Sequence, residues 1–257
     1  MKYIFSGHEK FECKSDWISR FLLEYKKDND ILNRDIEFII EKLGLGKNMI
    51  NSLNFWLKML NIYDKELTFL GKTILEKDVF LESKNTIWLL HYYLSKTNTI
   101  YNLFFNKLYF LRFKKEELFL EISKLYNVSE NSLKNDIDVF IRLYNQGIFS
   151  ELNLFKIGEF ISLNLGQNID DEVFLYALID VFENKKSDTL SVYELEKGEI
   201  SLLQIFLLDE NSFFNKINKI EMISDNKIEY RESAGFRTLF LKENIDKNEI
   251  LRKCIEI

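Results

Sequence analysis

The sequence contains no proline and only nine glycines among its 257 residues. Barrels and sandwiches need many tight turns, and these two residues build most such turns, so their scarcity argues against those folds. Apolar residues instead recur at intervals of three and four, which is typical of helices. We therefore predict a mainly α fold with small β-hairpins that serve as wings, arranged as tandem winged helix-turn-helix-like units.

Cysteine and histidine are also scarce, with two residues of each. Cys13 and Cys254 stand at opposite ends of the chain, which fits neither a disulfide framework nor a zinc site. His91 lies in an aromatic stretch and is expected to be a core residue. No metal and no cofactor are predicted, because His8 and His91 supply too few ligands. His8 and Glu9 would point to opposite sides of an extended segment, so catalysis through this pair is the least favoured hypothesis.

Long apolar runs are missing as well. No segment reaches the ~18 apolar residues that cross a membrane, and the first residues lack the apolar stretch of a signal peptide. No membrane association is predicted, and the cytoplasm is the expected location.

The net charge of −6 at first argues against a nucleic-acid partner, but the charge is unevenly distributed. Residues 1–80 carry 13 basic and 13 acidic side chains, residues 81–150 carry 9 and 7, and residues 151–257 carry 13 and 21. A local basic stripe can therefore still bind phosphates outside the acidic last portion. Neither earlier portion is strongly basic, so nucleic-acid binding is expected to be weak or shared with a partner.

The chain divides into three predicted domains, with the same bounds as the three ranges of the charge count. Residues 1–80 hold an N-terminal segment and a winged helix-turn-helix. Residues 81–150 hold an aromatic helical region, expected to form a core or a dimer contact, and a second helix-turn-helix-like pair. Residues 151–257 form an acidic α+β domain, for which a further winged helix is one option.

The best candidate for a functional surface is the helix predicted from Lys47 to about Leu60. A helix over about 30–43 precedes it and stops at residues 44–46 (GLG), while residues 62–68 suggest a small wing. One face of the later helix is apolar. The opposite face is expected to contact duplex DNA, since lysine neutralises phosphates and asparagine can bind adenine. The residues expected to make these contacts are Lys47, Asn48, Asn51, Ser52, Asn54 and Lys58. The alternative is a solvated face in a chain rich in asparagine and lysine.

Two other elements carry secondary candidates. The helix predicted after Ser129, which is a plausible cap, presents Lys134 and Arg142, but Asp138 on the same face would repel phosphates. A structural or protein-contact role is favoured there. A hairpin predicted from strands 227–232 and 236–242 carries Arg237, which could reach a phosphate from a wing. Salt bridges from its arginines to the hairpin's glutamates are the preferred interpretation.

Five short segments resemble motifs of a bacterial family, domain of unknown function 4007. They are residues 5–11 (FSGHEKF), 43–49 (LGLGKNM), 86–92 (TIWLLHY), 133–138 (LKNDID) and 232–237 (ESAGFR). The matches occur in order and span nearly the whole chain. Asn135 departs from the family, which often has arginine there, and this lowers the charge of the second helix-turn-helix candidate.

The resemblance implies no known activity for the family. Genes of this family tend to lie near phosphoadenosine-phosphosulfate-reductase-like genes in DNA-modification or phage-defence clusters, and the resemblance implies the same neighbourhood here. We therefore expect a DNA-binding accessory protein of such a system. The alternative is a protein-interaction subunit that binds other defence proteins without touching DNA, and a homodimer is possible in either case. His8 lies in the first motif, and its ring is expected to tie the N-terminal segment to the body.

Overall fold

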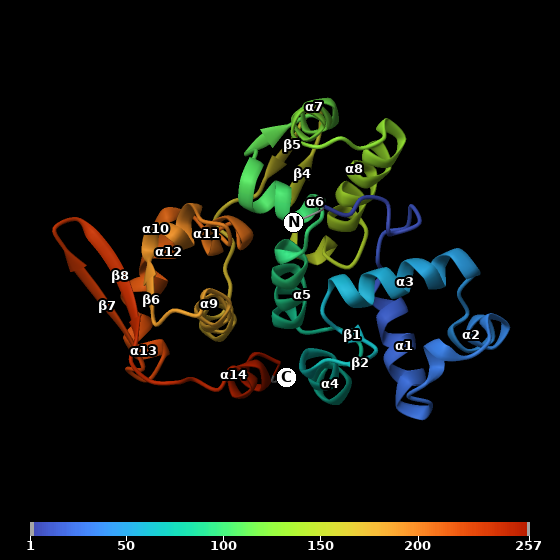
Figure 1. Cartoon of the computed structure of the whole chain (residues 1–257), viewed down its shortest axis with the longest axis horizontal. Coiled ribbons are helices and arrows are strands. Elements are labelled where there is room, and N and C mark those ends of the chain that lie inside the picture. Colours follow the sequence, from blue (N-terminus) through green and yellow to red (C-terminus); the bar gives the residue numbers. More distant parts are fainter. Residues whose placement is uncertain (1–2, 256–257) are drawn as a thin grey trace.

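The first helical unit follows an N-terminal strap, residues 3–14, which contains turns but no helix or strand (Figure 1). The structure, a computed structural model, describes residues 3–255. Gly44 ends the second helix at a φ of 64°, a left-handed conformation that glycine adopts without strain, so the predicted glycine turn is confirmed. The elements are α1 (Ser15–Lys27), η1 (Ile31–Asn33), α2 (Ile36–Leu43), α3 (Lys47–Met59), β1 (Tyr63–Asp64), β2 (Glu66–Leu67) and α4 (Phe69–Lys77).

The second unit begins with the aromatic helices. The first of these is regular, but the second consists of one short turn and a π-helical segment. Ser129 caps the later helix as predicted, because its hydroxyl oxygen accepts the Ser132 N–H at 3.2 Å. The elements are α5 (Lys84–Lys96), α6 (Ile100–Asn102), η2 (Leu103–Leu108), β3 (Arg112–Phe113), α7 (Lys115–Leu125), α8 (Glu130–Asn145), η3 (Ser150–Leu152), β4 (Phe155–Ile157) and β5 (Ile161–Leu163).

The third unit contains the predicted hairpin and several short helices. Asp209 caps one of them through its carboxylate, which accepts the Ser212 N–H at 2.7 Å. The elements are α9 (Asp171–Lys185), β6 (Thr189–Ser191), α10 (Val192–Lys197), α11 (Leu202–Ile205), α12 (Glu210–Asn218), α13 (Ile220–Ile223), β7 (Ile228–Ser233), β8 (Phe236–Leu241) and α14 (Lys247–Cys254).

The second and third units repeat one topology. In each, a strand precedes the inner helices and pairs with the last strand of a following hairpin, so the sheet orders are β3-β5-β4 and β6-β8-β7. All these pairings are antiparallel. The prediction of a mainly helical fold with small β-hairpins is confirmed, although β3, β4, β5 and β6 were not predicted and the hairpins of the second and third units belong to three-stranded sheets.

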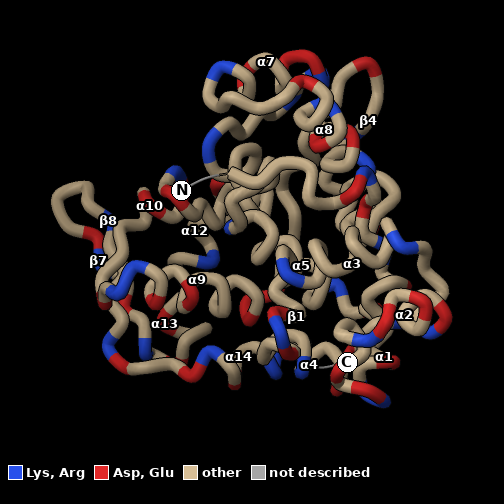
Figure 2. The backbone as a smooth tube through the Cα atoms, turned by 45° about the vertical axis from the view of Figure 1, so that its right-hand side comes forward, with Lys and Arg blue, Asp and Glu red and all other residues tan. Residues whose placement is uncertain are grey.

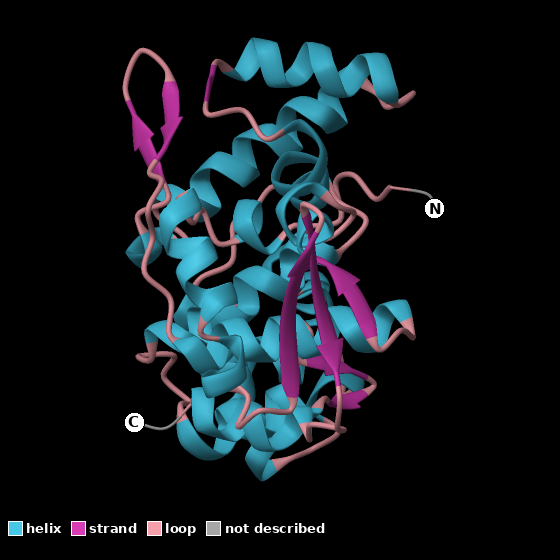
Figure 3. Cartoon of the chain, turned by 90° about the vertical axis from the view of Figure 1, so that its left-hand side faces the viewer, coloured by secondary structure: helices cyan, strands magenta, loops and turns pink. Residues whose placement is uncertain are grey.

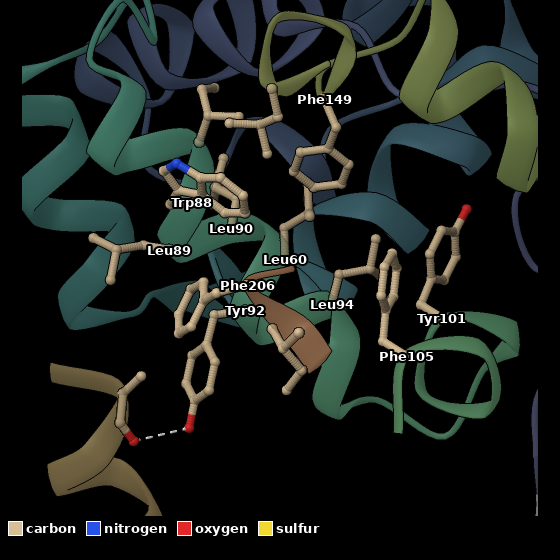
Figure 4. Packing of buried hydrophobic residues seen from close by; sticks show 14 of the residues in the cluster. Leu60, Trp88, Leu89, Leu90, Tyr92, Leu94, Tyr101, Phe105, Phe149 and Phe206 are labelled. Carbon is tan, nitrogen blue, oxygen red and sulfur yellow. Dashed lines mark hydrogen bonds between the residues drawn. The ribbon is translucent and has the colours of Figure 1, made fainter. Parts of the chain in front are cut away.

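The aromatic region forms the core around α5. Nine of the thirteen residues of α5 are buried, among them Trp88 and Tyr92. Figure 4 shows their rings beside Phe206, with the Tyr92 hydroxyl donating to the Ala177 carbonyl at 3.2 Å. These contacts join α5 to the third unit, so the aromatic region serves as a core, which was one of the two roles expected for it. No helix among residues 3–255 is long and apolar enough to span a membrane.

His91 is the satisfied core histidine that the sequence predicts. Its Nε2–H donates to the Ile205 carbonyl at 2.7 Å, and its Nδ1 accepts from the Tyr144 hydroxyl at 2.8 Å. The carbonyl can only accept, which assigns the ring proton to Nε2. Burial lowers the pKa of His91 to about 4, so the ring is neutral at physiological pH.

Candidate nucleic-acid interface

Helix α3 separates its side chains into a buried and an exposed face. Its apolar face packs into the core and includes Ile50, Leu53, Trp56 and Leu57. The exposed side chains are those of Lys47, Asn48, Asn51, Asn54 and Lys58. They include no carboxylate, so the exposed face of α3 can offer only cations and amides to a ligand.

Ser52 does not belong to that face. Its side chain is buried, and its hydroxyl donates to the Phe11 carbonyl of the strap at 3.5 Å. The prediction that Ser52 contacts DNA is therefore wrong. Helical spacing placed it at the border between the two faces, and the strap covers that border.

The N-terminus of α3 is open. Gly46 precedes the helix and supplies no capping side chain. A Cβ atom built on Gly46 would meet no atom within 4 Å. The N–H groups of the first helical turn therefore face accessible space, and such groups favour an anion.

The charges around this face are mixed. Lys58 lies 3.4 Å from Asp64 in the β1–β2 hairpin, and Lys42 lies 3.5 Å from Glu41. Exposed pairs of this kind contribute little to stability, so Lys58 can exchange its partner for a phosphate. Figure 2 shows basic and acidic segments interspersed over the whole chain rather than gathered in one basic stripe.

The strap connects α3 to α8 through His8. The Lys10 N–H donates to His8 Nδ1 at 3.1 Å, so Nε2 carries the ring proton and donates to Asp136 of α8 at 2.6 Å. The ring also stacks on Trp56 of α3, with 6.1 Å between centroids. His8 is only 4% exposed, whereas Glu9 points to solvent. The structure thus places His8 in the tethering position expected for it, and no joint site forms with Glu9.

Close packing explains the glycine of the first motif. A Cβ atom at Gly7 would lie 2.4 Å from the ring of Phe55, so the strap can approach α3 only with glycine there. Nearby, Trp56 Nε1–H donates to the Phe11 carbonyl at 3.0 Å. Both contacts hold the strap against the partly buried side of α3 and leave its exposed face uncovered.

We expect His8→Ala to lower the free energy of unfolding by about 1–2 kcal/mol, because buried Asp136 loses its side-chain donor. Loosening of the strap should also accelerate tryptic cleavage after Lys10 and Lys14. Glu9→Ala is the matched control, since it removes an exposed neighbour. Equal cleavage rates in the two variants would show that His8 does not hold the strap.

The secondary candidates on α8 are engaged by other residues. Lys134 pairs with Glu130 one turn earlier. Arg142 donates to the Lys10 carbonyl at 2.6 Å and lies 3.4 Å from Glu12, so it fastens the strap. Asp138 is exposed on the same helix.

In the hairpin, Arg237 lies 3.3 Å from Glu232, and Arg231 lies 2.9 Å from Glu229. The preferred interpretation of these arginines as salt-bridge partners is confirmed.

Asp136 is the residue of this region that sequence reasoning missed. It is buried, and it accepts from the Ser6 backbone N–H at 2.8 Å as well as from His8. The only sequence signal was its position within the motif at residues 133–138. A contact between residues 128 positions apart cannot be read from local spacing.

Comparisons with known proteins identify a family and a shared fold. A family profile described as DUF4007, protein of unknown function, matches residues 5–255. The chain belongs to this family. No curated protein matches it. Two solved structures, described as "SspB crystal structure" and "Magnesium ion-bound SspB crystal structure", share its fold with a TM-score of 0.81 and 18% identity; each match covers 98% of this chain and 86% of the other.

One of these two neighbours is described as bound to magnesium. Within the described part of this DUF4007 chain, residues 3–255, no three His, Cys, Asp or Glu side chains group closely enough to hold a metal ion. We therefore assign no metal ligands and derive no metal-dependent step.

Proposed function

We propose that this protein binds duplex DNA through the exposed face of α3, as an accessory protein of a bacterial DNA-modification or phage-defence system. The observation that carries the proposal is a helix-turn-helix whose second helix exposes only lysine and asparagine on its outer face. Helices in that position enter the major groove, where amide side chains can bind base edges.

The repeated topology supports a fold built from tandem winged-helix units. The second and third units each place a strand before their inner helices and a hairpin after them, with the first and last strands paired. The first unit has α2 and α3 followed by the β1–β2 hairpin, which acts as a minimal wing. The exposed face of α3 carries no acidic side chain, whereas α8 exposes Asp138.

The chemistry of the α3 face suits modest affinity. Lys47 and Lys58 can neutralise phosphates, and Asn51 and Asn54 lie between them on the exposed side. The open N-terminus adds N–H donors for one more phosphate. Because these contacts neutralise phosphates and release their counterions, we expect binding to weaken as the salt concentration rises.

Charge reversal tests this surface directly. Lys47→Glu combined with Lys58→Glu should weaken duplex DNA binding at low salt by about tenfold or more. The slope of log affinity against log salt should fall by about 1.8, since each lost phosphate contact removes about 0.9. Fluorescence anisotropy with a labelled duplex measures both quantities.

The matched control reverses two exposed lysines elsewhere, Lys156 on β4 and Lys197 on α10. It makes the same change in net charge but leaves the α3 face intact, so it should bind DNA nearly as well as the parent. If both double variants bind equally, general charge rather than the α3 face governs binding, and the assignment fails.

A protein-interaction subunit is the second candidate. Leu120 and Leu125 on α7 are both 56% exposed, which is unusual for leucine on a helix and suits a protein contact. If the parent shifts no duplex at low salt but co-purifies with the product of a neighbouring gene, this second function replaces the first.

A further inference from the structure

The β7–β8 hairpin projects from the third unit (Figure 1), and in Figure 3 its two long strands lie in front of the helices. β6 pairs only with residues 238–240 of β8, so the distal half of the hairpin extends beyond the sheet. Ala234 and Gly235 both have positive φ, at 49° and 82°, which makes a tight two-residue turn. The residues of the tip are therefore held in a defined orientation.

Phe236 lies at this tip and is 77% exposed. Behind it, Glu232 and Arg237 face each other across the two strands. Arg231 is likewise neutralised by Glu229. An aromatic tip on a charge-balanced arm is poorly suited to phosphates and well suited to an apolar pocket with a rim of mixed charge.

Such a pocket exists on the same chain. Helices α7 and α8 form an open groove of about 380 Å³ lined by the apolar side chains of Phe119, Leu120 and Ile137. Its remaining lining residues are two lysines and two acidic residues, namely Lys115, Lys134, Glu116 and Asp138. The volume lies in the range of pockets that bind small ligands, so the groove has room for an aromatic ring.

We propose that Phe236 of one copy inserts into the α7–α8 groove of a second copy. Both apolar surfaces are then removed from water, and the Glu232–Arg237 pair meets a rim that carries both signs of charge. The hairpin cannot reach its own groove, because its base is fixed by β6 and its tip and α7 lie in different parts of the molecule (Figure 1). The proposal does not depend on whether α3 binds DNA.

The predicted contact is small compared with a stable dimer interface, so the self-association is weak and depends on concentration. In sedimentation velocity, the average mass of the parent should rise above 30.8 kDa as its concentration increases. Phe236→Ser and Leu120→Asp should each weaken association at least tenfold. Met222→Ser is the control, since Met222 is a comparably exposed apolar residue, at 67%, outside the contact.

Mixing the two defective variants gives the decisive measurement. Phe236→Ser retains an intact groove and Leu120→Asp an intact hairpin, so an equimolar mixture should form a pair of about twice 30.8 kDa that neither variant forms alone. A parent that stays monomeric at every concentration would overturn the proposal, as would a mixture that stays monomeric. Loss of duplex DNA binding in Phe236→Ser, with unchanged association, would assign the tip to DNA instead.

Discussion

Replacing Asp180 with asparagine is expected to lower the free energy of unfolding by about 3–5 kcal/mol. Asp180 lies on α9, and its side chain is only 6% exposed. Its carboxylate accepts from the Tyr92 hydroxyl at 2.8 Å and from Lys247 at 2.9 Å, and it also pairs with Lys96. One buried carboxylate therefore joins α9 to α5 and to the start of α14.

The carboxylate is charged in the folded protein. Burial alone would raise the pKa of Asp180, but Lys96 and Lys247 outweigh burial and hold the pKa below its usual range. In the asparagine variant, Lys96 would lose its carboxylate partner, and Lys247 would keep only Glu183. The cost is that of leaving a charge buried and unpaired, which greatly exceeds the loss of an exposed pair.

Two further variants separate this cause from lost packing. Glu183→Gln removes the second partner of Lys247. The Glu183 side chain is 50% exposed, so this change should lower the free energy of unfolding by less than about 1 kcal/mol. Combining Asp180→Asn with Lys96→Met removes the unpaired charge and should restore part of the stability. Urea denaturation measures all three variants. If adding Lys96→Met lowers the free energy of unfolding further, unpaired charge is not the cause of the loss.

The stability of the protein is expected to fall as the pH drops from about 6.5 to about 4 because of His91. In the folded state, burial lowers the pKa of His91 from 6.5 to about 4. Between these values the unfolded chain binds a proton at this residue and the folded protein does not. Acid therefore favours the unfolded state, and the full contribution of His91 amounts to about 3 kcal/mol.

His91→Gln tests this expectation because glutamine can still bond to Ile205 but does not titrate. The parent should lose about 2 kcal/mol more stability than the variant between pH 7 and pH 4.5. The comparison cancels the contributions of all other ionisable groups, which both proteins share. Parallel stability profiles for the two proteins would show that His91 does not titrate with a lowered pKa.

Local sequence was sufficient where the structure depends on near neighbours. The glycine turn before α3 was predicted from residues 44–46, and the cap of α8 from Ser129. The β7–β8 hairpin was also predicted, because its two strands adjoin one tight turn. Family membership followed from ordered motifs along the chain, which require no knowledge of contacts.

The strands β3 and β6 had no such signal. They span two and three residues, too few to show an alternating pattern, and each exists because it pairs with a strand about 50 residues later. The repeated topology therefore became visible only in the folded chain. Ser52 was misplaced for a related reason, since the strap that buries it lies about 40 residues earlier.

By itself, the sequence determined the helical class, the principal turns and caps, the family, and a lysine- and asparagine-rich helix as the best candidate surface. Hydrogen bonds and apolar periodicity within a few residues decide those features. Only the tertiary structure decided that His8 meets Asp136, that Asp180 gathers two lysines, and that the strap leaves the α3 face open. These contacts join distant segments, and burial gives them their energetic weight.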